Sequence, residues 1–480
     1  MFHRMAPGFL LLLPLWLVSS SFVPDQRSTV EEAFDGQWVG EAVGEEESTY
    51  LMVGIYRVGG SLVGSVTLPH PGFVRIEFDS LAVAGRQLFA AASRDSLVLD
   101  VSEQEGGWIE GTFQSGGESL PVRLVRSGSP EAGEYAERIG TLVEAFRSDS
   151  RLERTVDGGA AARLSGEAIE ELVAAADEAF TSSLVIFKDG EPVGEWYRNG
   201  ISRRIQAMSV TKVTLNLAVG RLLTRGHIES IDTPVHTVAP EWSSGPRSRI
   251  TFRHLLNHTS GLPPGVPANE IYEAPDIEAY SLALEPVHEP GTVMEYNNNG
   301  TNVLAAVIRR VAGMPIDEFI GREIFEPLGI TDFTWLRDPS GNPHGMAGLS
   351  IHARDLARVG QLVLDQGWWN GESLIDPEWF TKSFQPSAPD VDTEGVLDGR
   401  SHTVGLIWFL IRHDLDEPGD SLGDKFGMQH SGDLGQWLVI YPEEGLVGVR
   451  MAQFSPAFDA ETDLYFAFMD HLHKVAPAAR

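Results

Sequence analysis

The stretch 205–220, which reads IQAMSVTKVTLNLAVG, constrains the fold of this chain more than any other. Its apolar residues recur at helical spacing, with Val213 and Leu217 near one face, which predicts a buried helix that begins near Ser209. A serine at a helix N-terminus lies beside free backbone N–H groups and the positive end of the helix dipole. Lys212 follows three residues later on the same face, so its amine can reach the Ser209 hydroxyl.

A serine and a lysine at this spacing can supply a nucleophile and its base from one helical turn. A hydroxyl becomes a good nucleophile only when a neighbouring base takes its proton. An amine can act as that base only where burial or a nearby positive charge keeps it partly neutral. Nearly all of the 36 basic residues are arginine, which cannot lose its proton in a protein. A lysine retained on an apolar helix therefore indicates a chemical role, although the spacing alone also arises by chance.

The composition limits the classes of partner. The chain of 480 residues is long enough for two or three domains, and its hydrophobic content of 42% is typical of globular proteins. Its formal net charge of −32 would repel phosphate backbones and anionic lipids, so nucleic acid is excluded as an expected partner. The chain has no cysteine, which excludes disulfides, thiolate chemistry and a lipid-modified cysteine.

Residues 1–21 are typical of a secretory signal peptide. Arg4 gives a short positive start, and residues 7–18 (PGFLLLLPLWLV) form an apolar core that is too short to predict a membrane span. The serines at 19–21 supply small residues for cleavage, without the preferred Ala-x-Ala. An uncleaved anchor is the alternative. This interpretation predicts a periplasmic or secreted protein, with no stable membrane insertion once the signal is cleaved.

Residues 34–126 alternate short apolar runs with glycine turns, which predicts a small β-barrel or sandwich as an accessory domain. The expected strands are Tyr50–Tyr56, Ser61–Thr67, Val74–Phe78, Gln87–Ala91, Ser96–Val101, Gly107–Gln114 and Ser119–Val125. The sequence Gly36-Gln37-Trp38 is similar to the Gly-x-Trp start of lipocalin-like barrels. We interpret Trp38 as an apolar plug at one end of the barrel, in preference to a ligand-binding interior.

A helix and a linker are expected at 127–164, with the helix at Pro130–Phe146 and the linker at Gly158–Ala162. The second domain, 165–474, begins with helical spacing at Ser165–Phe180. The other expected elements are helices at Val303–Val311, Ala353–Asp365 and Thr462–His471, and strands at Ser183–Lys188, Glu191–Tyr197, Gln436–Tyr441 and Gly445–Met451. Helices beside an antiparallel sheet, without regular βαβ alternation, indicate a mixed α/β (α+β) fold class.

Two later stretches could join Ser209 and Lys212 in one site. Glu295–Gly300 (EYNNNG) is a polar turn that runs into a helix, where Tyr296 could relay protons and an asparagine amide could hold a substrate carbonyl or N–H. Phe426–Trp437 (FGMQHSGDLGQW) enters a strand, and its glycine-flanked backbone could offer N–H groups to a developing oxyanion. Each stretch, taken alone, is also compatible with an ordinary turn.

In this order, Ser-x-x-Lys, Tyr-x-Asn and a basic residue followed by Ser/Thr-Gly resemble the class C β-lactamase and DD-peptidase family of serine hydrolases, which is related to penicillin-binding proteins. The resemblance covers Ser165 to His473. It extends to three flanking phrases, Leu256–Leu262 (LNHTSGL), Phe325–Ile330 (FEPLGI) and Ala353–Ala357 (ARDLA). The resemblance implies a β-lactamase/transpeptidase-like domain, with an antiparallel sheet flanked by helices, that requires no metal or cofactor.

The resemblance also implies a role for each motif residue. Ser209 would be the acylated nucleophile and Lys212 its base, while Tyr296 would protonate the leaving group and activate the deacylating water. The backbone N–H groups of Ser209 and Asp433 would form the oxyanion hole, in which one donor is worth about 3 kcal/mol in the transition state. The expected substrate-binding residues are Asn298, His430, Ser431 and Gly432.

Departures from the family pattern affect the expected substrate. β-Lactamases of this family usually carry Lys-Thr-Gly in the third motif, where the lysine holds the carboxylate of the antibiotic. Here His430 takes that place, and a histidine is largely uncharged at neutral pH. Asp433 adds a negative charge beside the oxyanion strand, and Gly432–Gln436 resembles the corresponding strand of esterases and aminohexanoate-oligomer amidases of the family. We therefore expect an exported serine hydrolase that cleaves an ester or amide bond, D-amino-acid peptides included, through an acyl-Ser209 intermediate.

Alternatives stay open at this point. A β-lactamase is one, and a non-catalytic penicillin- or peptidoglycan-binding protein is another, although a pure binder would not need the serine, lysine and tyrosine together. Gly419–Gly423 (GDSLG) matches the nucleophile elbow of α/β-hydrolases, but it lies in an acidic stretch without the strand and helix that such an elbow needs. His258 and Ser260 could form a second nucleophile pair, but residues two apart in such a loop more often cap or turn the backbone. The expected partner is a small-molecule or peptide substrate, and no oligomeric state is predicted.

Overall fold

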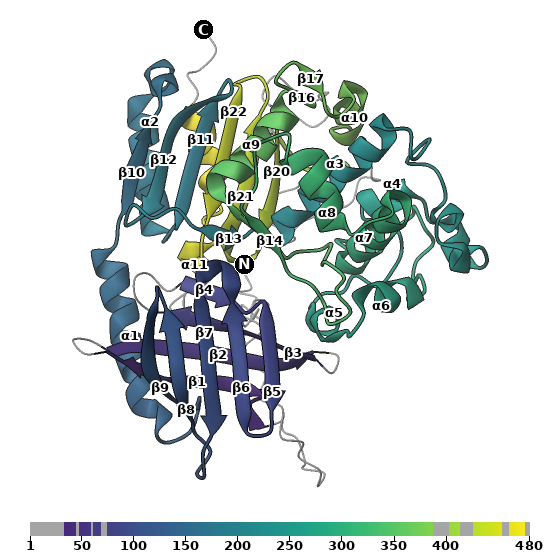
Figure 1. The fold of residues 1–480 in the computed structure, drawn as a ribbon. Helices are drawn as coiled ribbons and strands as arrows, with labels where there is room; N and C mark the ends of the chain where they lie inside the picture. The colour runs from purple at the N-terminus through teal and green to yellow at the C-terminus, as the bar shows by residue number, and fades with distance from the viewer. Residues whose placement is uncertain are drawn as a thin grey trace, which may run out of the picture.

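The structure is a computed structural model that describes residues 33–44, 48–58, 61–68, 74–386, 403–412, 426–453 and 460–475. The expected signal peptide at 1–21 and the Gly419–Gly423 motif lie outside these residues. Figure 1 shows two bodies, a barrel-like sheet formed by the N-terminal strands and a larger body of helices and strands. The mixed α/β fold class, with an antiparallel sheet flanked by helices and an N-terminal β-barrel, is confirmed.

The first body is an antiparallel β-barrel. Its described strands are β1 (Gly36–Val43), β2 (Ser48–Val58), β3 (Ser61–Leu68), β4 (Val74–Glu77), β5 (Ser80–Ala84), β6 (Gln87–Ala92), β7 (Leu97–Glu103), β8 (Ile109–Ser115) and β9 (Glu118–Arg126). Their spatial order is β4-β3-β2-β1-β9-β8-β7-β6-β5, so β4 and β5 lie at its two ends. Only Phe78 and Asp79 separate these strands, and their N–H groups donate to Gly64 O in β3 (2.9 Å) and Ala91 O in β6 (2.8 Å). The sheet therefore nearly closes on itself.

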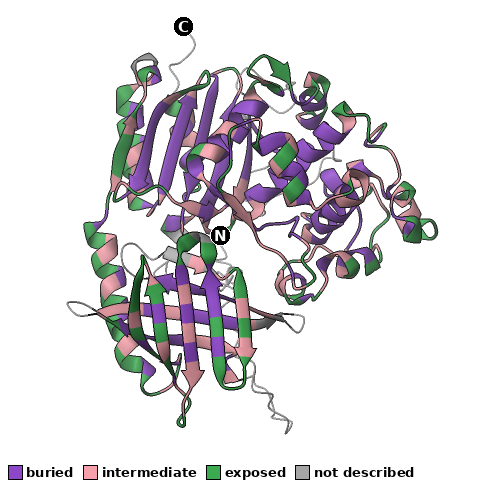
Figure 2. Ribbon diagram, viewed as in Figure 1, coloured by how far each residue is buried: buried purple, intermediate pink, exposed green. Residues whose placement is uncertain are grey.

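Trp38, in β1, lies inside the barrel and is 1% exposed. Its Nε1 donates to Phe34 O at 2.9 Å, and the Arg126 guanidinium lies 4.6 Å from the centre of its ring. Arg126 also donates to the carbonyls of Asp35 (2.7 Å) and Ala33 (2.6 Å). Figure 2 shows buried residues alternating with exposed ones along the barrel strands, as a filled apolar interior requires. This geometry favours the plug over a ligand-binding interior.

Helix α1 (Ala132–Asp149) connects the two bodies. One side of it packs on the barrel through Ile139, in a cluster with buried residues of β1 and β9. Near its C-terminus, Arg147 donates two hydrogen bonds, both 2.9 Å long, to the carboxylate of Asp463 in the larger body. The same guanidinium lies 4.3 Å from the centre of the Phe180 ring. Arg147 therefore fastens the helix, and with it the barrel, to the larger body.

We expect Arg147→Met to lower the free energy of unfolding by about 2 kcal/mol, because the Asp463 side chain is only 3% exposed and loses its charged donor. Urea unfolding measures this change. Arg138→Met is the matched control, since Arg138 lies on the same helix and its ion pair with Glu134 is exposed. Equal shifts of the unfolding midpoint in both variants would contradict the structural role of Arg147.

The larger body contains, among its described residues, an eight-stranded antiparallel sheet in the order β10-β12-β11-β22-β21-β20-β19-β18. The strands are β10 (Leu152–Asp157), β11 (Ser183–Lys188), β12 (Glu191–Arg198), β18 (Thr403–Val404), β19 (Phe409–Arg412), β20 (Phe426–Gly432), β21 (Gln436–Tyr441) and β22 (Leu446–Met451). Helices α2 (Gly166–Glu178) and α12 (Phe468–Val475) pack on one face, with Leu172 and Trp437 in their shared apolar cluster. Helix α9 (Ala353–Leu364) packs on the other face. The central strands β11, β21 and β22 are thus buried on both faces.

The segment expected as a linker, Gly158–Ala162, is packed against the larger body. The strand before it, β10, already pairs with β12 in the eight-stranded sheet. A Cβ atom at Gly158 would lie 1.5 Å from Pro192 O, so the backbones touch there and only glycine fits. Composition alone does not reveal this contact, because a run of glycine and alanine is equally suited to close packing and to a free tether.

The single helix expected at Thr462–His471 is two short helices, α11 (Ala460–Asp463) and α12. Between them, Tyr465 has a left-handed backbone with φ of 51°. Its hydroxyl donates to Leu172 O at 3.3 Å, which ties the break to α2. Tertiary contacts therefore override the helical spacing of this segment.

A group of helices beside the sheet carries the motifs. Helix α3 (Thr211–Thr224) lies at its centre, next to α7 (Asn298–Ala312) and a small sheet in the order β13-β15-β14. The small sheet consists of β13 (Arg204–Gln206), β14 (Phe333–Trp335) and β15 (Leu349–His352). The other described α-helices and β-strands are α4 (Phe252–Leu256), α5 (Asn269–Glu273), α6 (Ile277–Ala283), α8 (Ile316–Ile320), α10 (Pro377–Ser383), β16 (Trp368–Trp369) and β17 (Glu372–Ser373). None of the described helices combines the length and the apolar character that crossing a membrane requires.

Candidate active site

Ser209 lies in a single 3₁₀ turn, 208–210, that connects β13 to α3. The turn is fixed on the small sheet because Ala207 N donates to Leu349 O at 2.7 Å. Met208 has a φ of 49°, in the left-handed region that non-glycine residues rarely adopt. Such strain persists where the surroundings impose it, which is common at functional sites. The helix predicted to begin near Ser209 is present, and α3 is buried from Thr211 to Leu222.

Lys212 reaches back from the first turn of α3 to the serine. Its Nζ lies 3.0 Å from Ser209 Oγ and donates to Met346 O at 2.7 Å. The residue is 0% exposed, and burial lowers the pKa of its amine well below the ordinary value of lysine. Because of this lowered pKa, the amine loses its proton and exposes a free electron pair at a lower pH than an ordinary lysine does. It can therefore accept the hydroxyl proton of the serine.

The carbonyl that holds Lys212 belongs to a turn that is locked onto α7. Asn302 Oδ1 accepts hydrogen bonds from Gly345 N (2.9 Å) and Met346 N (3.1 Å). A Cβ atom at Gly345 would lie 2.5 Å from Thr301 O, so glycine permits the turn to sit against the helix. With one amine hydrogen bound to Met346 O, the electron pair of the amine can face Ser209. Sequence reasoning missed these residues, since a backbone carbonyl has no sequence signature.

Tyr296 directly precedes the N-cap of α7. The cap is Asn297, whose side chain accepts a hydrogen bond from Gly300 N. The centre of the tyrosine ring lies 4.8 Å from Lys212 Nζ. Burial raises the pKa of Tyr296 well above its ordinary value, and a hydrogen bond with Ser209 acts in the opposite direction with smaller effect. The phenol is therefore protonated at neutral pH and lies where it can pass a proton to or from the serine oxygen.

Strand β20 brings the third motif against Ser209. A Cβ atom at Gly432 would lie 2.7 Å from Ala207 O and 3.0 Å from Ser209 N. Glycine is therefore required for β20 to approach so closely. The backbone at Gly432, which continues into Asp433, therefore lies close to the Ser209 N–H. Asp433 is exposed as a whole residue, while burial of its carboxyl raises the pKa of that group.

His430 lies on the same face of β20 as Gly432, and it is 1% exposed. Its Nδ1 is 2.8 Å from Ser431 O, and a carbonyl only accepts, so the ring proton is on Nδ1. Its Nε2 is then an acceptor, and it is buried without a hydrogen-bond partner in the described residues. Burial, and to a lesser extent the charge on Lys212, lowers the pKa of His430 well below the ordinary value. The site therefore offers a neutral acceptor where a lysine would offer a cation.

The remaining predicted residues lie at the periphery. Asn298 Nδ2 donates to Gly265 O at 3.1 Å, so the amide nitrogen is engaged by the neighbouring loop. Ser431 is partly exposed, on the opposite face of β20 from His430. Ser209, Lys212 and Tyr296 thus form one tight cluster with Gly432 against it. Asn298 follows Tyr296 by two residues and Ser431 directly precedes Gly432, so both are next to the cluster along the chain.

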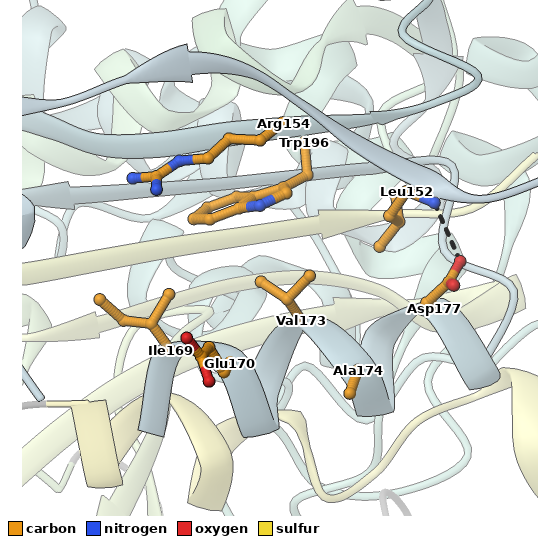
Figure 3. A pocket seen from close by; sticks show the side chains of 8 residues that line it. All are labelled: Leu152, Arg154, Ile169, Glu170, Val173, Ala174, Asp177 and Trp196. Atoms are coloured by element: carbon orange, nitrogen blue, oxygen red, sulfur yellow. Dashed lines mark hydrogen bonds between the residues drawn. The ribbon is translucent and has the colours of Figure 1, made fainter. Parts of the chain in front are cut away.

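A cavity of about 270 Å³ lies apart from this cluster, between α2 and the strands β10 and β12. Figure 3 shows apolar side chains of α2 facing Trp196 across it. Two of its charged groups already have partners, since Asp177 binds Arg198 at 2.6 Å and Arg154 binds Asp157 at 2.9 Å. None of the residues that line it is a predicted site residue. They are Leu152, Arg154, Ile169, Glu170, Val173, Ala174, Asp177 and Trp196.

Comparison with known proteins gives a consistent result. Residues 169–468 match the family described as Beta-lactamase. The chain is 26% identical over 223 residues to 6-aminohexanoate-dimer hydrolase of Paenarthrobacter ureafaciens, which covers 42% of this chain and 57% of that protein. It is 28% identical over 208 residues to a Beta-lactamase of Escherichia coli (strain K12), which covers 42% of this chain and 52% of that protein. The match thus spans just over half the length of these curated relatives. A solved family VIII carboxylesterase shares the fold, with a TM-score of 0.54 and 17% identity over 67% of this chain and 100% of that chain.

Proposed function

Because this chain belongs to the Beta-lactamase family, whose members are serine hydrolases, we propose that it cleaves an ester or amide bond through a covalent acyl intermediate on Ser209. The observation that carries the proposal is the 3.0 Å distance between Lys212 Nζ and Ser209 Oγ, at a lysine that is fully buried. A buried amine with a lowered pKa can serve as the general base that a serine nucleophile requires.

In this mechanism, Lys212 takes the Ser209 proton as the hydroxyl oxygen attacks the substrate carbonyl. The backbone N–H groups of Ser209 and Asp433 stabilise the oxyanion that forms. Tyr296 then donates a proton to the leaving alcohol or amine as the bond to it breaks, and the acyl group remains on the serine. In the second half of the cycle, Tyr296 helps to activate the water that releases the acid.

Because His430 is neutral, the site favours a substrate that has no carboxylate next to the reacting carbonyl. Its Nε2 is an acceptor, so the lone pair on this nitrogen would repel the carboxylate of a β-lactam. The exposed Asp433 adds a like charge. We therefore rank a neutral ester or amide, including a D-amino-acid peptide bond, above a β-lactam, with a penicillin-binding function as the remaining alternative.

We also propose that the chain acts outside the cytoplasm, either in a periplasm or after secretion. The support is its sequence, since residues 1–21 are typical of an export signal and the chain has no cysteine. Cell fractionation of the full-length chain tests this proposal. Recovery of the uncleaved chain from the cytosol would refute it.

Labelling with a fluorescent fluorophosphonate, followed by peptide mapping, tests the hydrolase proposal directly. We expect one adduct, on the peptide that contains Ser209. A p-nitrophenyl ester, a D-alanyl peptide and a cephalosporin assayed side by side then identify the substrate class, and we expect turnover of the first two to exceed that of the third. An unlabelled protein that binds penicillin without turnover would favour the binding function.

A further inference from the structure

His258 lies in the loop after α4, within the phrase LNHTSGL, and the mechanism above gives it no role. The side chain is 1% exposed, and the backbone is left-handed with φ of 59°. A buried histidine in a strained backbone needs a local cause. The contacts of His258 are with Tyr296 and with the residues on either side of that tyrosine.

His258 binds the chain on both sides of the tyrosine. Glu295 N donates to His258 O at 2.9 Å, and Asn297 N donates to His258 Nδ1 at 3.2 Å. Between these two bonds, the imidazole packs on the phenol ring of Tyr296, with 5.0 Å between the ring centres. His258 therefore restrains Tyr296 through hydrogen bonds to the residues on either side of it and through the contact between the two rings.

The hydrogen bonds also fix the protonation of the imidazole. A backbone N–H only donates, so Nδ1 must be unprotonated and the ring proton lies on Nε2. Burial, together with the charge on Lys212, lowers the pKa of His258 to about 3. The ring therefore remains neutral at neutral pH, and the bond from Asn297 persists over the range in which a lysine base would act.

We propose that His258 is a positioning residue that holds the Tyr296 hydroxyl in line to protonate the leaving group. This inference rests on the proposed hydrolase function. When the tetrahedral intermediate collapses, the bond from carbon to the leaving oxygen or nitrogen breaks and its electron pair goes to that atom. The proton that Lys212 took from Ser209 is relayed through Tyr296 to the same atom, so charge and protons balance.

A leaving group that needs no proton provides the test. A p-nitrophenolate leaves as a stable anion, whereas an alkoxide must be protonated as it leaves. Loss of a positioned acid therefore slows acylation by an alkyl ester far more than acylation by a p-nitrophenyl ester of the same acyl group. A loss of folding or of acyl binding would slow both esters equally.

Two variants separate the functions of the imidazole. His258→Asn keeps an acceptor at the place of Nδ1 and tolerates the left-handed backbone. His258→Phe keeps the ring and removes the acceptor. The matched control is His254→Phe, because His254 Nδ1 also accepts a backbone N–H, from Thr251 at 3.3 Å, but it holds the start of α4.

We expect His258→Phe to lower kcat/KM, which reports acylation without the shared deacylation step, on the order of 100-fold on the alkyl ester and by less than about 5-fold on the p-nitrophenyl ester. His258→Asn should recover most of the lost rate, and His254→Phe should change neither ester selectively. Equal losses on both esters, or no loss on either, would overturn the inference. Should the phenylalanine variant fail to fold in a melting experiment, His258→Leu replaces it as the variant without an acceptor.

The outcome separates this inference from the proposed function. If the wild-type protein forms no adduct at Ser209, the hydrolase proposal fails and this inference fails with it. If the wild type is labelled and turns over both esters while His258→Phe shows no leaving-group preference, only the role of His258 is refuted.

Discussion

Ser209→Ala is expected to abolish covalent labelling and to lower kcat on any good substrate by on the order of 10⁵-fold. The oxyanion donors and the binding surface would remain, so some residual rate over water should persist. The fold should be unaffected, because Ser209 lies in a 3₁₀ turn and loses only the hydrogen bonds of its hydroxyl with Lys212 Nζ and Tyr296. Fluorophosphonate labelling and turnover of a p-nitrophenyl ester measure both effects.

Ser421→Ala is the control for this variant, because Ser421 is the serine of the alternative Gly419–Gly423 motif. We expect full labelling and full activity in that protein. If instead Ser209→Ala retains the adduct and Ser421→Ala loses it, the nucleophile is wrongly assigned. The two variants thus decide between the two serine motifs of the sequence.

Lys212→Arg should lower kcat/KM by roughly 10³-fold, the effect of removing a general base, although it keeps a cation at the site. A guanidinium remains protonated in proteins and cannot take the serine proton. In the wild type, burial lowers the pKa of Lys212, so the amine is protonated below that pKa and neutral above it. Activity should therefore rise as pH rises through the lowered pKa, and the arginine variant should lack this limb of the profile.

Lys382→Arg is the matched control, because Lys382 is half exposed and pairs with Glu378 on the surface. Its activity and pH profile should equal those of the wild type. A buried arginine is bulky, so Lys212→Met provides a second variant that lacks the base and fits the apolar site. Retention of the rising limb in either Lys212 variant would show that another group accepts the proton.

The spacing of apolar residues predicted helices and strands well where interactions within a few residues determine them. The hairpin Ser183–Lys188 and Glu191–Tyr197 matches β11 and β12, because the Asp-Gly turn and the alternation both act within a few residues. In the barrel, β1 and β5 escaped prediction. β1 buries three successive residues, which breaks the alternation, and β5 is a short continuation of β4.

The residues of the candidate site also differ in how far the local sequence determines their positions. Ser209 and Lys212 could be paired from the sequence because one helical turn sets their distance. Tyr296 could be joined to them only by the order of the motifs, since the structure brings it to Lys212 through the folding of α7 against α3. The bond from Asn302 to the turn at Met346 could not be predicted, because it depends on where a backbone segment from elsewhere in the chain docks.

The near closure of the N-terminal sheet has a consequence for the behaviour of the chain at high concentration. Unpaired strand edges recruit strands of other molecules, and a sheet whose ends meet presents few of them. The sheet of the larger body begins at β10, which carries charged side chains such as Glu153, Arg154 and Asp157 that discourage such pairing. Together with mutual repulsion at a net charge of −32, these features should keep the folded protein from aggregating through β-augmentation.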